Sequence, residues 1–178
     1  MAEQAPTAVT AASGRSAGFA DILDIELDRA YRVAGHLLGD ACDAEDAVQD
    51  ALTQAWAARR SLRNPEAASA WFWRILVNNC RSRLRRRRGP QVRDLGDDVD
   101  LAGDDPFEMS LARDEVLRAM ANLSADHRIA IVLRFWGDFT VPEIARRTGA
   151  REGTVKSRLH AAIGALRRDM DANGEARR

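Results

Sequence analysis

Cysteine is nearly absent from this chain, which has 2 cysteines in 178 residues. Cys42 and Cys80 stand in unrelated segments, with no Cys-x-x-Cys or Cys/His spacing around them. A disulfide framework and a zinc site are therefore not indicated. Two buried free thiols of a reducing compartment are the favoured interpretation, and a disulfide or a metal site is the alternative.

Long apolar runs and a net charge are also missing. No stretch of 18 apolar residues exists, so no transmembrane helix is expected. The first residues are rich in Ala, Ser, Thr and Gly and lack the basic segment and apolar core of a secretory signal. We expect a disordered tail over 1–18. With 27 basic and 27 acidic residues the formal charge is 0, so only the distribution of charge along the chain indicates partners.

Helical periodicity dominates the sequence, and no strand signal or internal repeat is present. Apolar residues step by threes and fours through 19–38 until Gly39 interrupts them. A second helix is predicted over 43–60, with Asp43 as a plausible N-cap, and a third over 70–86. These patterns predict an all-α fold.

A composition break divides the chain near its middle. Residues 89–111 carry two prolines, three glycines and no helical stripe, with seven acids and one base between Arg93 and Glu108. Six arginines among the eight residues at 81–88 come directly before. Opposed charge blocks of this kind mark segments with different partners. We predict two small helical domains, 19–88 and 112–171, joined by a flexible acidic linker and followed by a tail at 172–178.

The second half carries the pattern of a helix-turn-helix. A helix is predicted at 111–123, and Ser124 caps the next, which ends at Gly137. Thr140 and Glu143 form a capping box before a short helix at 141–148. Gly149 then makes the turn into a longer amphipathic helix. Such a pair of helices places the second one in the major groove of DNA.

The last helix has a buried edge and a narrow polar strip with basic sides. The buried edge is expected to consist of Val155, Leu159, Ala162, Ile163 and Leu166. Base edges would be read by Arg151, Glu152, Thr154, Ser157 and Arg158. Phosphates would be held by Arg146, Arg147, Lys156 and Arg167. A helical hairpin in a domain that does not bind DNA is the alternative interpretation.

Two faces of the first half also suggest binding. One face of the helix at 70–86 carries Trp71, Arg74, Asn78 and Arg81, which suits an unpaired strand because a ring stacks on bases and arginines take phosphate. Trp71 as an ordinary core residue is the equally weighted alternative. The polar side of the helix at 43–60 is acidic and fits a basic protein surface, although a solvated face is the simpler interpretation.

Three stretches together resemble a known family. They are LLGDACDAEDAVQDALTQAWAA, AWFWRILVNNCRSRLRRRR and LSADHRIAIVLRFWGDFTVPEIARRTGAREGTVKSRLHAAIGALRR. They are similar to the extracytoplasmic-function (ECF) sigma factors of bacterial RNA polymerase, of the sigma-70 family. The resemblance covers about 19–88 and 112–170. It implies two helical domains, σ2 and σ4, with no domain between them.

The resemblance also implies a role for each surface. The acidic helix would dock on the polymerase clamp through Asp43, Glu45, Asp46, Gln49 and Asp50. The loop at 61–69 would capture a flipped base of the minus-ten element, and the next helix would support strand opening. The residues of this minus-ten surface would be Arg63, Asn64, Ser69, Trp71, Trp73, Arg74, Asn78 and Arg81. The σ4 recognition helix would read the minus-thirty-five element, and the acidic linker would mimic RNA.

The implied partners are core RNA polymerase with its beta and beta-prime subunits, promoter DNA and an anti-sigma factor. The protein would be no enzyme, would need no cofactor or metal, and would work in the bacterial cytoplasm at the nucleoid. Two features depart from the family pattern: Arg151 stands where a capping serine is common, and the loop at 61–69 lacks glycine. A repressor or activator that never touches polymerase and a helical protein–protein adaptor are the rival functions.

Overall fold

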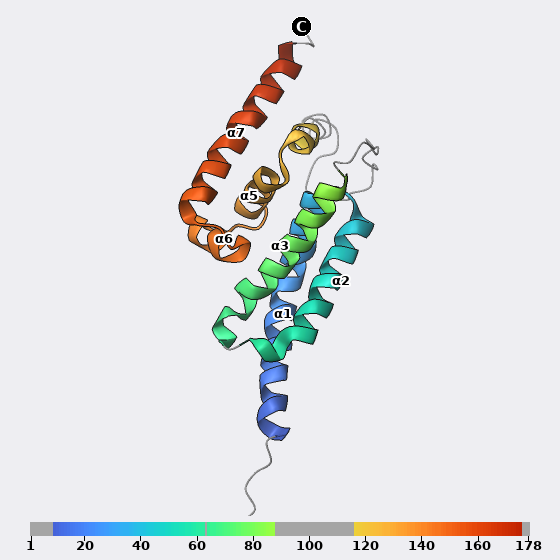
Figure 1. The fold of residues 1–178 in the computed structure, drawn as a ribbon. Coiled ribbons are helices and arrows are strands. Elements are labelled where there is room, and N and C mark those ends of the chain that lie inside the picture. The colour runs from blue at the N-terminus through green and yellow to red at the C-terminus, as the bar shows by residue number, and fades with distance from the viewer. Residues whose placement is uncertain (1–8, 63, 88–115, 176–178) are drawn as a thin grey trace, which may run out of the picture.

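The computed structural model describes residues 9–62, 64–87 and 116–175, and every regular element within these ranges is helical. The all-α prediction is confirmed. Figure 1 shows two groups of helices side by side, one from each half of the chain. The predicted acidic linker at 89–111, with its RNA-mimicking role, lies outside the described residues.

The first group, which we call the N-terminal bundle, consists of α1 (Val9–Leu38), α2 (Ala41–Ala58) and α3 (Ala68–Arg87), each in contact with the other two. Two 3₁₀ turns, η1 (Arg59–Ser61) and η2 (Pro65–Ala67), connect α2 to α3. The buried side of α2 is mostly alanine, including the fully buried Ala47, Ala51 and Ala55. Small side chains let helix axes approach closely, so α2 packs tightly against α1 and α3 around one core.

The start of α2 differs from the prediction. Gly39 has a left-handed φ of 65°, and Asp40 after it is extended at φ −150°. Asp40 Oδ1 accepts a hydrogen bond from the backbone N of Asp43 at 2.8 Å, so Asp40 is the N-cap. The predicted cap, Asp43, lies in the first turn instead. There its negative carboxylate interacts favourably with the positive end of the helix dipole.

The ends of α1, α3 and α7 also lie outside their predicted limits. Helix α1 begins at Val9, so residues 9–18, expected to belong to the tail, are helical in the structure. Helix α3 runs over Ala68–Arg87, slightly longer than the predicted 70–86. Helix α7 runs to Glu175, past the expected domain end at 171.

The second group, the C-terminal unit, consists of a helical segment at 116–122, α5 (Ala125–Phe135), α6 (Val141–Thr148) and α7 (Glu152–Glu175). Of the helix predicted at 111–123, only this segment lies among the described residues. Ser124 caps α5 as predicted, its Oγ accepting a hydrogen bond from the backbone N of His127 at 3.2 Å. The bounds of α6 are those predicted from the capping box and Gly149.

The two groups share one continuous core, because α3 contacts α5 and α6 and α1 contacts α5. At the centre of the junction the ring of Trp73 meets that of Phe139 edge-on, with centroids 4.9 Å apart. Trp73 Nε1 donates a hydrogen bond to Glu26 Oε2 at 2.9 Å, which satisfies its only polar atom. The halves of the chain are separate in sequence and packed together in space.

The two cysteines differ in environment. Cys80 is buried in the N-terminal bundle, as expected, whereas Cys42 is exposed on α2, contrary to the expectation of two buried thiols. None of the described helices combines the length and the apolar character needed to span a bilayer.

Candidate interaction surfaces

The short helix of the helix-turn-helix, α6, is capped at both ends by neighbouring residues. At its start, Glu143 Oε2 accepts hydrogen bonds from the backbone N and the Oγ1 of Thr140 at 2.8 and 2.7 Å. These bonds lower the pKa of the Glu143 carboxyl. At its end, Gly149 has φ 68°, a left-handed conformation that suits glycine. These two signals set where α6 ends and the direction in which α7 leaves.

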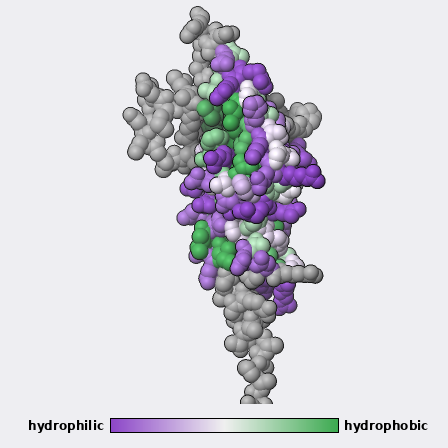
Figure 2. All heavy atoms as spheres, turned by 90° about the vertical axis from the view of Figure 1, so that its left-hand side faces the viewer, coloured by the Kyte–Doolittle hydropathy of each residue, from purple (hydrophilic) through white to green (hydrophobic). Residues whose placement is uncertain are grey.

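The predicted rotation of α7 is confirmed. Val155 and Ala162 are buried, and Leu159, Ile163 and Leu166 pack against the core from partly buried positions. Most of the predicted base-reading residues lie on the exposed side, namely Arg151, Glu152, Thr154 and Ser157. Lys156, Arg146 and Arg167 are exposed as well. Figure 2, which faces the side where α6 and α7 lie in Figure 1, shows mostly hydrophilic residues over the visible surface.

One predicted phosphate contact, Arg147, is buried. Its side chain lies over the ring of Phe139, with Cζ 4.0 Å from the ring centroid, and the residue is 7% exposed. Burial lowers the pKa of this guanidinium, and Glu143, 3.8 Å away, opposes the shift. The sequence places Arg147 beside the exposed Arg146, but one step along a helix is a rotation of about 100°. Arg147 therefore belongs to the junction and cannot reach DNA in this arrangement.

Arg158 and Arg81 share one carboxylate. Arg158 Nη2 and Arg81 Nε each lie 2.9 Å from an oxygen of Asp126, the acid in the first turn of α5. Arg81 also donates a hydrogen bond from Nη1 to Asn78 Oδ1 at 2.8 Å. The structure thus brings a predicted residue of the minus-ten surface together with one of the recognition helix.

A polar cleft of about 570 Å³ opens at the same place, between α3 and the helix-turn-helix. Its lining includes Asn78, Arg81, Arg85, Asp126, Thr154 and Arg158. Nearby, Arg74 packs on the turn: a Cβ added to Gly149 would lie 3.1 Å from the Arg74 guanidinium carbon. Arg74, Asn78 and Arg81, predicted to face a DNA strand, face the C-terminal unit here.

The prediction that Trp73 belongs to the minus-ten surface is wrong for this arrangement, because Trp73 is fully buried against Phe139. The helical face predicted from the sequence, with Trp71, Arg74, Asn78 and Arg81, does not include Trp73. Trp73 lies instead on the side of the buried Phe72. Trp71 itself is half-buried and packs against the core, which is close to its alternative interpretation. Ser69 is tied inward, its Oγ donating a hydrogen bond to Glu26 Oε1 at 2.5 Å.

The loop before α3 is described only in part. Arg63 lies outside the described residues. Asn64 is exposed, and its side-chain oxygen accepts a hydrogen bond from the backbone N of Glu66 at 3.0 Å. This bond shapes the turn into η2 and leaves the amide nitrogen facing away from it.

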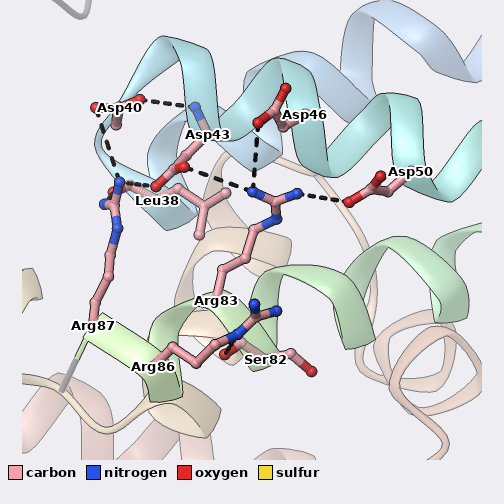
Figure 3. A network of polar contacts seen from close by, with 9 residues as sticks. All are labelled: Leu38, Asp40, Asp43, Asp46, Asp50, Ser82, Arg83, Arg86 and Arg87. Carbon is pink, nitrogen blue, oxygen red and sulfur yellow. Dashed lines mark hydrogen bonds and ion pairs between the residues drawn. The ribbon is translucent and has the colours of Figure 1, made fainter. Parts of the chain in front are cut away.

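The acidic stripe of α2 faces the arginines at the end of α3 (Figure 3). Arg83 Nη2 lies 2.6 Å from Asp50 Oδ2, and Arg83 Nη1 lies 3.6 Å from Asp43 and 3.9 Å from Asp46. Arg87 pairs with Asp43 and donates a hydrogen bond to the carbonyl of Leu38 at 2.5 Å. The basic run is therefore partly used within the fold, which its sequence did not reveal.

The stripe consequently has two edges. Asp43 is the inner one, with a side chain 32% exposed and two arginine partners, whereas the Asp46 side chain is 71% exposed. Glu45 and Gln49 are exposed on the same helix. Asp50 is intermediate, since it is bonded to Arg83 yet 56% exposed.

Sequence reasoning missed two residues that organise these surfaces. Glu26 holds Ser69 and Trp73, and Asp126 holds Arg81 and Arg158. Asp126 looks like an ordinary first-turn acid after the Ser124 cap, so no local pattern distinguishes it. Their partners lie 32 to 47 residues away along the chain, a separation that periodicity does not report.

Comparison with known families divides the chain as the fold does. Residues 23–89 match Sigma-70 region 2, and residues 113–166 match Sigma-70, region 4. The first match covers most of the N-terminal bundle and the second covers most of the C-terminal unit. Below, the N-terminal bundle is called the region 2 unit and the C-terminal unit is called the region 4 unit.

Several characterised proteins are similar over most of their length. The chain is 35% identical to the ECF RNA polymerase sigma factor SigL of Mycobacterium tuberculosis over 160 residues, 83% of this chain and 85% of SigL. It is 34% identical to the ECF RNA polymerase sigma factor RpoE of Cereibacter sphaeroides over 148 residues, 79% of this chain and 81% of RpoE.

Solved structures show the same architecture. The sigma factor RpoE in its complex with the anti-sigma factor NepR from Bartonella quintana has a TM-score of 0.64 and 32% identity, covering 86% of this chain and 96% of RpoE. CnrH, in complex with the cytosolic domain of CnrY, has a TM-score of 0.66 at 23% identity, covering 90% of this chain and 95% of CnrH, and shows the fold alone. The two matched regions and the identity to SigL over most of both chains show that this protein belongs to the ECF sigma factors of RNA polymerase, which direct transcription.

Proposed function

We propose that this sigma factor directs polymerase by reading the minus-thirty-five element as duplex DNA and the minus-ten element as a melted strand. The observation that carries the proposal is the geometry of α7: a buried edge, an exposed opposite strip, and a start fixed by the capping box and Gly149. A helix presented in this way enters the major groove through its N-terminal residues. The strip supports direct base reading by Arg151, Glu152, Thr154 and Ser157, with Arg146 and Lys156 on phosphates.

The minus-ten surface is proposed on α3 and the loop before it. Arg74 and Asn78 are exposed and lie on one face with Arg81 and the half-buried Trp71. Single-stranded DNA is held by arginines on phosphate and by stacking on a ring. Because Trp73 and Arg147 are buried, we leave them out of the DNA contacts.

Core polymerase is proposed to bind the acidic stripe of α2, through its beta or beta-prime subunit. The exposed edge, Glu45, Asp46 and Gln49, is open to a basic partner surface, and charge complementarity speeds association with such a partner. An anti-sigma factor is a further proposed partner, because the related RpoE was solved in complex with one. The cellular location proposed is the bacterial cytoplasm, at the nucleoid.

The test is promoter binding and transcription by reconstituted holoenzyme on a panel of single-base changes, at several salt concentrations. Replacing Arg151 or Ser157 with Ala should reduce the preference for the cognate minus-thirty-five sequence by about 1–3 kcal/mol. Replacing Lys156 with Ala should weaken binding about equally on all sequences and lower the salt slope by about one unit. If Lys156→Ala alters base preference and the other two variants keep it, the proposed strip does not face the bases.

A further inference from the structure

The two helices proposed to face DNA, α3 and α7, are both bound by one side chain of α5. Asp126 of α5 binds Arg81 of α3 with one carboxylate oxygen and Arg158 of α7 with the other, each at 2.9 Å. The three side chains are 28%, 17% and 26% exposed. Pairs so shielded from water are screened less than those on an open surface. Removing the carboxylate takes away the acid that the guanidinium groups of Arg81 and Arg158 share.

A carboxylate in this position offers the arginines what a DNA phosphate would offer. Both groups present oxygens to the guanidinium in charge-assisted hydrogen bonds. While these bonds are made, Nε of Arg81 and Nη2 of Arg158 are not available to phosphate or base, and Nη1 of Arg81 is bonded to Asn78. The Asp126–Arg81 bond therefore competes directly with nucleic acid for an arginine of the proposed minus-ten surface.

The distance between promoter elements makes this arrangement incompatible with reading both. Elements centred about 25 base pairs apart lie roughly 85 Å apart along B-DNA at about 3.4 Å per base pair. In the structure one carboxylate spans α3 and α7. A molecule bound to both elements must therefore have separated its region 2 and region 4 units and broken the Asp126–Arg81 bond that joins them.

Other contacts across the junction are of a different kind. Trp73 packs on Phe139, and Arg74 packs on the turn at Gly149. These contacts bury surface but carry no paired opposite charge. Arg128 also donates a hydrogen bond from Nη1 to the carbonyl of Leu37 at 3.2 Å, and the Arg29 guanidinium lies 5.1 Å from the centroid of Phe139. Asp126 supplies the ion pair with Arg81, which exists only in the closed arrangement.

We propose that Asp126 is an autoinhibitory clasp, which holds the free sigma factor closed by binding Arg81 of the other unit and releases that arginine when the units separate on polymerase and promoter. Its bond to Arg158 lies within the region 4 unit and positions the carboxylate. The inference rests on the proposed DNA-binding roles of α3 and α7. It predicts that loss of the carboxylate increases DNA binding by the free chain, whereas a merely structural role predicts a loss.

The test compares the full-length chain with Asp126→Asn and, as a second variant, Asp126→Ser. The matched control is Asp169→Asn, which removes the same charge from region 4 at a residue bonded to Asn122 rather than to α3. Opening is followed by energy transfer between dyes on the exposed Cys42 and on a Met170→Cys variant. Binding of unlabelled protein to a short mixed-sequence duplex is measured in parallel, and circular dichroism checks that helicity is kept.

Of the two charge-assisted bonds lost, only Asp126–Arg81 crosses the junction, and its loss should raise the open fraction, and with it the apparent affinity for DNA, by about tenfold. Added salt should open the wild type, and Asp126→Asn should respond less. The control should match the wild type in both readouts. Unchanged energy transfer in Asp126→Asn, or opening without a gain in DNA affinity, would overturn the clasp.

The clasp and the proposed function can fail separately. Wild-type protein mixed with core polymerase is assayed for transcription from genomic fragments in the same series. Absence of both transcription and DNA binding in the wild type and the variants would overturn the proposed function and the clasp with it. If the wild type transcribes and Asp126→Asn shows no gain in DNA affinity, the clasp alone is overturned.

Discussion

At the scale of single residues, the acidic stripe of α2 is not uniform. Asp43 is held by Arg83 and Arg87, whereas Asp46 is largely exposed and only 3.9 Å from Arg83. Neighbouring carboxylates on one helix face repel one another, and the arginines of α3 offset that repulsion on the inner edge. Asp43 therefore acts in the fold, while Asp46 is open to the proposed contact with polymerase.

Two matched variants separate these roles. Asp43→Asn should lower the free energy of unfolding by about 1 kcal/mol, because it leaves Arg87 without its main partner, and should change affinity for core polymerase little. Asp46→Asn should leave thermal unfolding nearly unchanged and weaken core binding several-fold, more at low salt. Thermal unfolding and binding titrations with core enzyme measure both. Equal loss of affinity in the two variants would show that the stripe binds as a whole.

The two cysteines provide a second test of residue environment. Burial raises the pKa of the Cys80 thiol to about 12, while Cys42 is exposed. Since the thiolate is the reactive form, native protein at pH 8 should react quickly with a thiol reagent at one position only. Mass spectrometry should locate the label on Cys42, and unfolded protein should react at both. Rapid labelling of Cys80 in native protein would contradict its burial on the inner side of α3.

At the scale of elements, the helix-turn-helix is specified by local chemistry. The capping box at Thr140 and the left-handed Gly149 set both ends of α6, and α7 turns its apolar edge inward with the period that its sequence shows. Each of these signals lies within a few residues of its effect. That is why the bounds of α6 were predicted correctly. The cap of α2 is equally local, but two aspartates stand near the start of that helix, and the prediction of Asp43 in place of Asp40 was wrong.

Thr140→Ala tests the capping box. Loss of the N-cap hydroxyl should lower the free energy of unfolding by about 1 kcal/mol. The pKa of Glu143 is lowered by its bonds to Thr140, so its contribution is complete above the ordinary glutamate pKa of about 4.3 and is lost as pH falls through the lower folded value. The difference between variant and wild type, measured by thermal unfolding, should therefore shrink in acid. Thr140→Ser is the control and should retain most of the stability.

At the scale of the whole molecule, the two units are coupled through a small aromatic contact. Phe139 of region 4 lies between Trp73 of region 2 and the guanidinium of Arg147. Its side chain is almost completely buried, so it contributes to the core of its own unit and to the junction at once. We expect the wild type to unfold in one cooperative transition for this reason.

Phe139→Ala should lower stability by about 3–5 kcal/mol and split the calorimetric transition into two, since it removes the ring that joins the cores. Val48→Ala, a buried truncation in α2, is the control: it should lower the transition temperature and keep a single transition. A single transition in Phe139→Ala would mean that coupling between the units depends on other contacts, such as Arg74 on the Gly149 turn.

The sequence by itself determined the features that depend on neighbours along the chain. Helical periods, the Ser124 cap, the capping box and the Gly149 turn gave the all-α class, the helix-turn-helix and the inward edge of α7. The acidic stripe of α2 and the exposed residues at the start of α7 were found for the same reason: each is a pattern within one helix.

Only the tertiary structure decided which of those residues are free. Trp73 and Arg147 appeared as DNA contacts in sequence and are buried at the junction, while Arg81 and Arg158 are bound by an aspartate that no motif marks. The physical reason is that burial and ion pairing depend on which helices meet. That meeting is set by the combined packing of both units, through contacts such as Trp73 on Phe139, whose partners lie far apart in the chain.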